Sequence, residues 1–185
     1  MDKSPDTAPA VESHGLRVTV LRGLAASLRY FDHMGRFAET ERETVGMSLP
    51  PPLRAATRST AGSGAEFILA WRSPTETLLL CTDHDQPVFA DLQQRLATAV
   101  GGSMVDQTGG IRGYRIQGQR SLDLMQRMGA TTAIPAMGEA RGGRLAEVQV
   151  LTVCIAAGEF LLLTERVYAD HLVEWMRATV ADFKQ

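Results

Sequence analysis

The chain has 185 residues, of which 44% are hydrophobic and 22% charged, and its formal net charge at pH 7 is −2. Without a concentrated excess of basic residues it lacks the charge pattern of a nucleic-acid-binding surface. No stretch approaches the roughly 18 apolar residues of a membrane-spanning helix, and the start of the chain lacks the pattern of a signal peptide. We therefore expect a cytoplasmic protein that binds neither nucleic acid nor membrane.

The beginning of the chain differs in composition from the rest. Residues 1–15 are polar and contain two prolines, which favours a loose tail followed by a single domain over residues 16–185. Residues 54–64 are rich in Ala, Thr, Ser and Gly and predict a mobile connection or an interface loop. The remaining patterns predict, in chain order, strands over 16–21 and 28–31, a helix over 37–45, a hairpin of 66–71 with 77–81, a helix over 85–100, strands over 103–107 and 111–116, a helix over 120–128, a loop over 130–143, a long strand over 144–156 paired with 159–164, and a C-terminal helix over 168–183.

One short phrase occurs twice. Residues 76–82 and 159–165 each place a glutamate and a spacer before three leucines, and each is followed by a stretch with helical periodicity. A compact apolar run of this length is typical of a strand buried on both faces. The repeat predicts an α+β fold of two similar half-units, each a β-hairpin with a covering helix, with mixed or antiparallel sheets covered by helices.

The sequence shows no catalytic constellation. His84 lies between two aspartates, the nearest approach to a metal cluster, but adjacent residues in a turn seldom converge on one ion. Cys81 and Cys154 lie in apolar runs and are expected to be reduced core residues. Asp170 and His171 are consecutive on a predicted helix, so their side chains diverge. We predict no catalytic, cofactor-binding or metal-binding residue in this chain.

Three segments in order carry a resemblance to a known family: residues 71–80, residues 105–108, and residues 165–172 with Trp175 after them. Their order and spacing resemble the gamma subunit of heterotetrameric sarcosine oxidase, over about residues 66–183. The family usually has a hairpin of the type Trp-Leu-Gly-Pro-Asp-Glu-Trp-Leu-Leu. The residues of this chain that match it are Trp71, Pro74, Glu76, Leu78 and Leu79.

The resemblance implies a fold like the folate-binding domain of glycine-cleavage aminomethyltransferases. It also implies a non-catalytic structural subunit of a bacterial-type, multisubunit, flavin-dependent sarcosine oxidase, which demethylates sarcosine to glycine in one-carbon metabolism. In such assemblies the larger alpha and beta subunits hold the flavins, NAD and tetrahydrofolate, and the small delta subunit holds zinc. This chain would then hold no cofactor and would bind those subunits.

The candidate partner contacts lie in two places. Arg72, Thr75 and Glu76 belong to the predicted hairpin turn, and Arg166 and Tyr168 lie where the last strand meets its helix. An alternative is that Glu76 and Arg166 form an ion pair inside the fold. Two other candidates, Trp71 and Trp175, are expected in the core.

Two other functions remain open. The chain can be a stand-alone folate-binding or aminomethyltransferase-like protein, in which case Glu76 and Asp106 are the carboxylates available to hold a pterin. It can also be a diverged homo-oligomer without an oxidase partner, which an exposed apolar patch covered by a second copy would favour.

Overall fold

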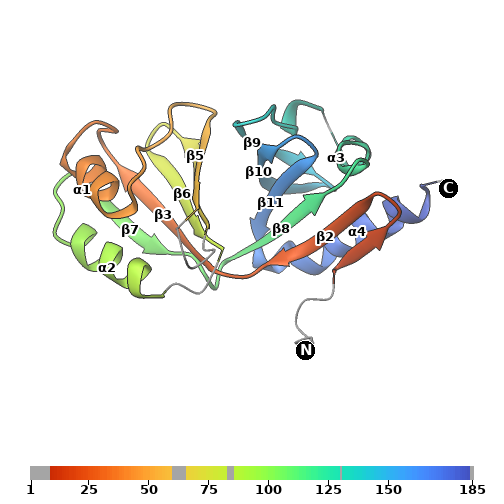
Figure 1. Cartoon of the computed structure of the whole chain (residues 1–185), viewed down its shortest axis with the longest axis horizontal. Coiled ribbons are helices and arrows are strands. Elements are labelled where there is room, and N and C mark those ends of the chain that lie inside the picture. Colours follow the sequence, from red (N-terminus) through yellow and green to blue (C-terminus); the bar gives the residue numbers. More distant parts are fainter. Residues whose placement is uncertain (1–8, 60–65, 83–85, 130, 184–185) are drawn as a thin grey trace. The chain divides into compact units, whose positions relative to one another are not determined.

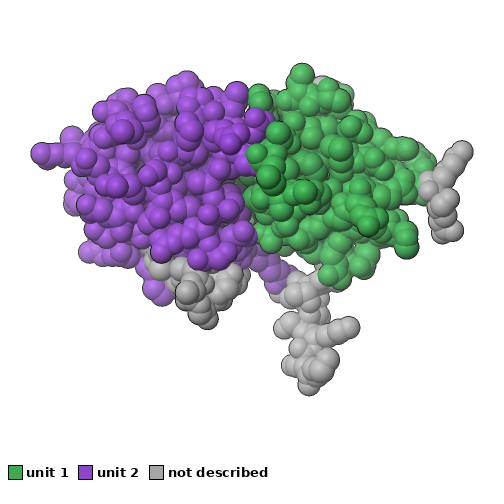
Figure 2. Space-filling view, turned by 45° about the horizontal axis from the view of Figure 1, so that its top comes forward, with its two compact units in different colours: residues 1–21, 111–137, 141–185 green, residues 22–110, 138–140 purple. Residues whose placement is uncertain are grey.

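The computed structural model describes residues 9–59, 66–82, 86–129 and 131–183 (Figure 1). The chain forms two compact units, which Figure 2 colours separately. Unit 1 comprises residues 1–21, 111–137 and 141–185, and unit 2 comprises residues 22–110 and 138–140. None of the helices in the described ranges is long and apolar enough to cross a membrane.

Unit 2 is a five-stranded sheet with two helices. The strand order is β4-β5-β6-β3-β7, and all neighbouring strands are antiparallel. The chain runs β3-α1-β4-β5-β6-α2-β7, a split βαβ arrangement with β4 as an added edge strand. Buried residues of both helices pack with those of the sheet in one core. The elements are β3 (Leu24–Tyr30), α1 (Arg36–Val45), β4 (Ala55–Ser59), β5 (Glu66–Ser73), β6 (Glu76–Cys81), α2 (Gln86–Leu96) and β7 (Gly102–Asp106).

Unit 1 is a six-stranded sheet with the order β1-β2-β8-β11-β10-β9. Helices α3 and α4 contribute to its core, together with residues of the sheet. The elements are β1 (Val11–Ser13), β2 (Leu16–Leu21), β8 (Ile111–Gln117), α3 (Ser121–Met128), η2 (Thr131–Ala133), β9 (Ala140–Leu145), β10 (Val148–Ala156), β11 (Glu159–Glu165), η3 (Arg166–Tyr168) and α4 (Ala169–Ala181).

The two units repeat one plan. The order β9-β10-β11-β8-β2 of unit 1 corresponds to β4-β5-β6-β3-β7 of unit 2. The strand in the fifth place of each order comes from a different part of the chain. In unit 2 it is β7, which follows helix α2, whereas in unit 1 it is β2, which comes before all of the elements of unit 2. Both hairpins also carry a register shift at the same point, between Trp71 and Ser73 and between Cys154 and Ala156. The predicted pair of hairpin-and-helix half-units is therefore confirmed.

Three predicted segments differ from the structure in the N-terminal part. The expected tail contains strand β1, whose Val11 is buried against the core of unit 1. The expected loop over 54–64 contains edge strand β4, because pairing with β5 organises residues too small and polar to signal a strand. The helix predicted to reach Val100 ends at Leu96, and Val100 is 72% exposed because the chain already turns towards β7.

The long strand predicted over residues 144–156 is mostly β10, and the loop predicted over 130–143 ends early, because β9 already begins at Ala140. Ala146 and Glu147 both have positive φ, 48° and 65°, and form the turn between β9 and β10. Such a turn usually contains Asn or Gly. Here tertiary contacts support it instead: the Ala146 amide donates to the Met128 carbonyl at 2.6 Å, and the Ala146 carbonyl lies 2.8 Å from His171 Nε2.

Candidate functional site

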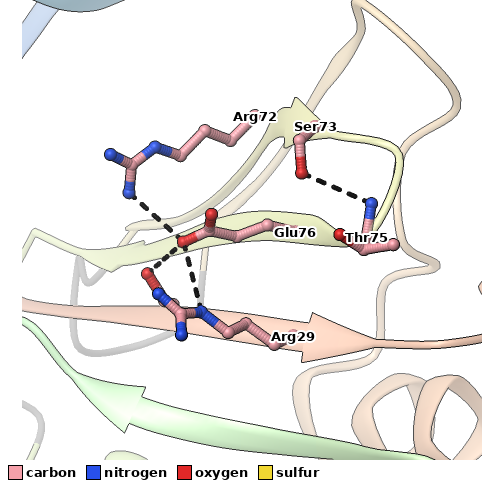
Figure 3. Close-up of polar contacts among 6 residues, drawn as sticks. Arg29, Arg72, Ser73, Thr75 and Glu76 are labelled. Atoms are coloured by element: carbon pink, nitrogen blue, oxygen red, sulfur yellow. Dashed lines mark hydrogen bonds and ion pairs between the residues drawn. The ribbon is translucent and has the colours of Figure 1, made fainter.

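The β5–β6 hairpin brings together three of the predicted contact residues, Arg72, Thr75 and Glu76 (Figure 3). Glu76 Oε1 accepts a hydrogen bond from the Ser27 hydroxyl at 2.6 Å and another from Arg72 Nη1 at 3.2 Å. Arg29 Nε lies 3.9 Å from the same oxygen. Among the described residues of unit 2, the ion-pair partners of Glu76 are thus Arg29 and Arg72.

A recess opens beside this hairpin, with a volume of about 460 Å³. We call it the hairpin recess. It lies where β3 ends, where β6 begins and where β7 begins. The lining residues are Arg29, Tyr30, Phe31, Thr75, Glu76, Gly102 and Ser103.

The main chain around the hairpin recess is held by hydrogen bonds. The Tyr30 amide donates to the Thr75 carbonyl at 3.1 Å, and the Phe31 amide donates to the Gly101 carbonyl at 3.0 Å. Tyr30 is buried, and its hydroxyl lies 2.9 Å from Thr77 Oγ1. Phe31 by contrast is 93% exposed. An aromatic ring is therefore presented to solvent from a fixed backbone position.

The charges at the hairpin recess do not balance. The side chains of Arg29 and Arg72 are 61% and 45% exposed, whereas that of Glu76 is 16% exposed. Two guanidinium groups thus share one carboxylate. Because that carboxylate is already hydrogen-bonded and paired, the arrangement suits recognition of an anion better than proton transfer.

The other two predicted contacts, Arg166 and Tyr168, lie in η3 of unit 1, so the structure does not place all five in one unit. Here Val167, Tyr168 and Trp175 are 79%, 42% and 39% exposed. We call these three residues, together with the exposed His171, the C-terminal stripe. The His171 and Trp175 rings are 5.7 Å apart between centroids.

The prediction that Trp175 is a core residue is wrong. Helix α4 buries a different face, formed by Ala169, Leu172, Met176 and Val180. Tyr168 and Trp175 lie one position to the side of that face, next to Ala169 and Met176 in sequence. Apolar residues on adjacent positions leave the buried face of a helix ambiguous by about 100° of rotation, so the sequence pattern alone does not decide between them. Trp71 is half-buried.

Asp106, the second carboxylate proposed for a pterin, is exposed and is the last residue of strand β7. Its Oδ1 accepts a hydrogen bond from the Thr108 amide at 2.8 Å. Asp106 pairs in register with Ala26, whereas Glu76 pairs with Arg29. Three residues along a strand span about 10 Å. The two carboxylates therefore lie at different positions along β3, and Asp106 is not part of the hairpin recess.

Sequence reasoning missed one buried carboxyl group, that of Glu41. It is 0% exposed, and neither carboxyl oxygen has a hydrogen-bond partner among the described residues. Burial raises its pKa from 4.5 to about 8, so the group is protonated at neutral pH. The signal was present, because Phe37, Glu41 and Val45 are spaced by four residues and share the buried face of α1.

The remaining candidates have structural roles. Burial also raises the pKa of Tyr114, whose hydroxyl donates to the Ala169 carbonyl at 2.8 Å. Cys81 and Cys154 are buried, as predicted. Within the described ranges no three His, Cys, Asp or Glu side chains gather as metal ligands. His84 and its neighbouring aspartates lie outside those ranges.

No protein-family profile matches the chain, and no curated protein matches its sequence. Its fold is similar to a chain of heterotetrameric sarcosine oxidase from Corynebacterium sp. U-96, with a TM-score of 0.77 and 14% identity over 96% of this chain and 89% of that chain. It is also similar to glycine cleavage system aminomethyltransferase T from Bartonella henselae, with a TM-score of 0.67 and 13% identity over 88% of this chain and 45% of that chain. These similarities confirm the predicted α+β, aminomethyltransferase-like fold.

Proposed function

We propose that this chain is a non-catalytic, gamma-type subunit of a multisubunit flavin-dependent oxidase that resembles sarcosine oxidase. One observation carries the proposal: the similarity to the sarcosine oxidase chain spans nearly the full length of both chains, 96% and 89%. The fold of this protein is therefore similar to most of one chain of such an assembly. By contrast, it covers just under half of the aminomethyltransferase chain.

Two surfaces of the chain fit a docking role. The C-terminal stripe exposes tyrosine and tryptophan, which are enriched among residues that dominate interface energies. The hairpin recess exposes Phe31 beside Arg29 and Arg72. We expect Arg72, Thr75, Glu76, Arg166 and Tyr168 to contact the partner subunits. Flavins, NAD and tetrahydrofolate then belong to the alpha and beta subunits, and the complex with these and the delta subunit is cytoplasmic.

Affinity purification of the tagged chain, made at its natural level in its own cells, tests this proposal. We expect large subunits and flavin absorbance to co-elute with the tag. Arg72→Glu and Arg166→Glu should reduce the recovered flavin, because each reverses a charge on a proposed contact surface. Arg144→Glu is the matched control, since Arg144 forms an exposed pair with Glu147 in the turn between β9 and β10. A colourless protein that elutes alone would contradict the proposal.

The second candidate, a folate-binding or aminomethyltransferase-like protein, is favoured by the TM-score of 0.67 to the aminomethyltransferase. Titration of the isolated chain with tetrahydrofolate separates the two functions. Saturable binding that is lost in Glu76→Gln or Asp106→Asn would favour the second candidate. The subunit proposal predicts that neither Glu76→Gln nor Asp106→Asn abolishes any binding of tetrahydrofolate to this chain alone.

A further inference from the structure

The repeat shows which residues in and beside the hairpin recess the fold does not require. Arg29 pairs in register with Glu76, and the corresponding pair in unit 1 is Gln117 with Glu159. The bulged residue is Arg72 in β5 and Ile155 in β10. Unit 1 builds the same hairpin and the same bulge without an arginine at either position. Arg29 and Arg72 are therefore additions to the scaffold.

The charge balance differs in the same way. In unit 1, Arg115 lies 3.3 Å from Glu159, and Arg17 lies 3.5 Å from Glu12 on the neighbouring strands. Each of these two arginines has a carboxylate of its own. In unit 2 the two arginines meet Glu76, and all the contacts converge on Oε1 of that residue. Among the described residues, this cluster of two arginines and Glu76 keeps one excess positive charge, and both arginine side chains are exposed to solvent.

The geometry around Arg29 suits a carboxylate. Its Nε approaches Glu76, at 3.9 Å, and no contact of its two terminal nitrogens is found among the described residues. A guanidinium group offers a planar fork that matches the two oxygens of a carboxylate. The side chains of Thr75 and Ser103 add hydroxyl groups to the same lining.

The hairpin recess also offers an apolar contact surface for the rest of a ligand, the ring of Phe31. Phe31 lines it, is 93% exposed, and extends from a backbone held by a hydrogen bond to Gly101. An offset or edge-on contact with a second ring stabilises such an aromatic side chain. The volume of about 460 Å³ falls in the range of small-molecule sites, roughly 300–1,000 Å³.

We propose that the hairpin recess binds a carboxylate attached to a flat apolar body, with the Arg29 guanidinium on the carboxylate and the Phe31 ring against the body. The subunit proposal uses the same surface, but this inference is tested on the chain alone, so the two can fail separately. The binding group can belong to a free organic acid or to an acidic side chain next to an aromatic residue.

The test uses the full chain and 4-fluorobenzoate as the probe, observed by fluorine NMR. We expect saturable binding with a dissociation constant of about 1 mM, typical of a fragment held by one ion pair and one ring contact. The uncharged isostere 4-fluorobenzamide should bind at least about tenfold more weakly, and added salt should weaken benzoate binding alone. A blocked Phe-Glu dipeptide, compared with Phe-Gln, then shows which source of the carboxylate is preferred.

Substitutions of the lining residues test whether 4-fluorobenzoate binds in the hairpin recess. Arg29→Gln and Phe31→Ala should each weaken 4-fluorobenzoate binding by about tenfold, and Arg144→Gln should leave it unchanged. The circular dichroism spectrum of each variant confirms that it is folded. The inference is overturned if the wild-type chain binds benzoate and benzamide equally, if it binds neither, or if folded Arg29→Gln binds benzoate as tightly as the wild type does.

Discussion

The two units build the same hairpin and use it differently. In both units, a backbone amide at the end of the strand that pairs with the hairpin donates to a carbonyl of the hairpin turn at 3.1 Å. In unit 2 the Tyr30 amide, at the end of β3, donates to Thr75, and in unit 1 the Gly118 amide, directly after β8, donates to Gly158. In unit 1 the main chain of Gly15 lies against Gly118, where a Cβ atom would overlap its carbonyl. In unit 2 the corresponding residue is Tyr30, and the hairpin recess lies beside it.

This difference separates the requirements of the fold from the additions to it. The three leucines, the bulge and the turn hydrogen bond occur in both units and serve the sheet. Arg29, Arg72 and the exposed Phe31 occur only in unit 2. Residues that one copy of a repeat lacks are the ones to examine for function. The following substitutions test the comparison, from the largest expected effect to the smallest.

The largest difference in stability should come from Glu41, a buried carboxyl in α1 that has no counterpart among the buried residues of α3. Its pKa is about 8 in the folded state, whereas the ordinary value for an unburied glutamate is 4.5, so the folded state binds more protons between these two values. Unit 2 should therefore lose about 4 kcal/mol of stability between pH 5 and pH 9.

Urea unfolding at several pH values measures this loss. Glu41→Met should be more stable than the wild type, with a gain that grows as the pH rises, because Met has no proton to lose. Glu39→Gln, at an exposed position of the same helix, should keep the wild-type pH dependence. An unchanged pH dependence in Glu41→Met would show that Glu41 does not control it.

Truncating the middle leucine of each repeated phrase tests whether the two hairpins are equivalent. Leu79 and Leu162 are both 0% exposed, each in the core of its own unit. Leu79→Ala and Leu162→Ala should each cost about 3 kcal/mol, because the cavity adds to the lost burial. Trp71 lies in unit 2 and Trp175 in unit 1, so Trp175→Phe and Trp71→Phe backgrounds let fluorescence report each unit separately. A loss confined to the wrong unit would contradict the assignment of the cores.

In unit 1 the close approach of the Gly15 backbone to residue 118 requires a glycine there, whereas unit 2 has Tyr30 at the corresponding position. Gly118 has φ of 121°, and a Cβ atom there would meet the Gly15 backbone. Gly118→Ala should therefore destabilise unit 1 by about 2 kcal/mol, measured by thermal unfolding. The matched control is Gly142→Ala, where a Cβ atom meets nothing within 4 Å. Equal melting temperatures for the two variants would contradict the close approach.

The glutamate that opens each repeated phrase should contribute least. Glu76→Gln and Glu159→Gln should each cost at most about 1 kcal/mol in urea unfolding, because the paired arginines are partly solvated. The loss in Glu76→Gln should shrink in high salt, since it also leaves Arg29 and Arg72 unneutralised. A cost of several kcal/mol would show that Glu76 is structural and would weaken its role as part of a binding surface.

The sequence patterns predicted the elements with strong periodicity, and missed those that depend on tertiary contacts. The two leucine strands, the helix ending at Gly46 and the β5–β6 and β10–β11 hairpins follow from local signals, and the Gly46 amide indeed donates to the Arg42 carbonyl. Strand β4 carries no local signal, because its partner β5 organises it. The turn at Ala146 and Glu147 likewise depends on distant residues.

The candidate site was predictable only in part. Residues of one turn, Arg72, Thr75 and Glu76, could be grouped because they are close in sequence. Arg29 and Phe31 reach the same place from about 40 or more residues away, through the pairing of β3 with β6. The exposure of Trp175 depends on which face of α4 packs on the sheet, a choice that adjacent apolar residues leave open.

The most direct test of the subunit proposal is the molar mass and flavin absorbance of the protein isolated gently from its own cells, measured together by light scattering on a size-exclusion column. We predict one peak with a mass well above the 20.1 kDa of this chain, in which this chain, larger subunits and bound flavin elute together. A colourless peak at 20.1 kDa would contradict the proposal. A colourless peak at a small multiple of that mass would instead favour a homo-oligomer.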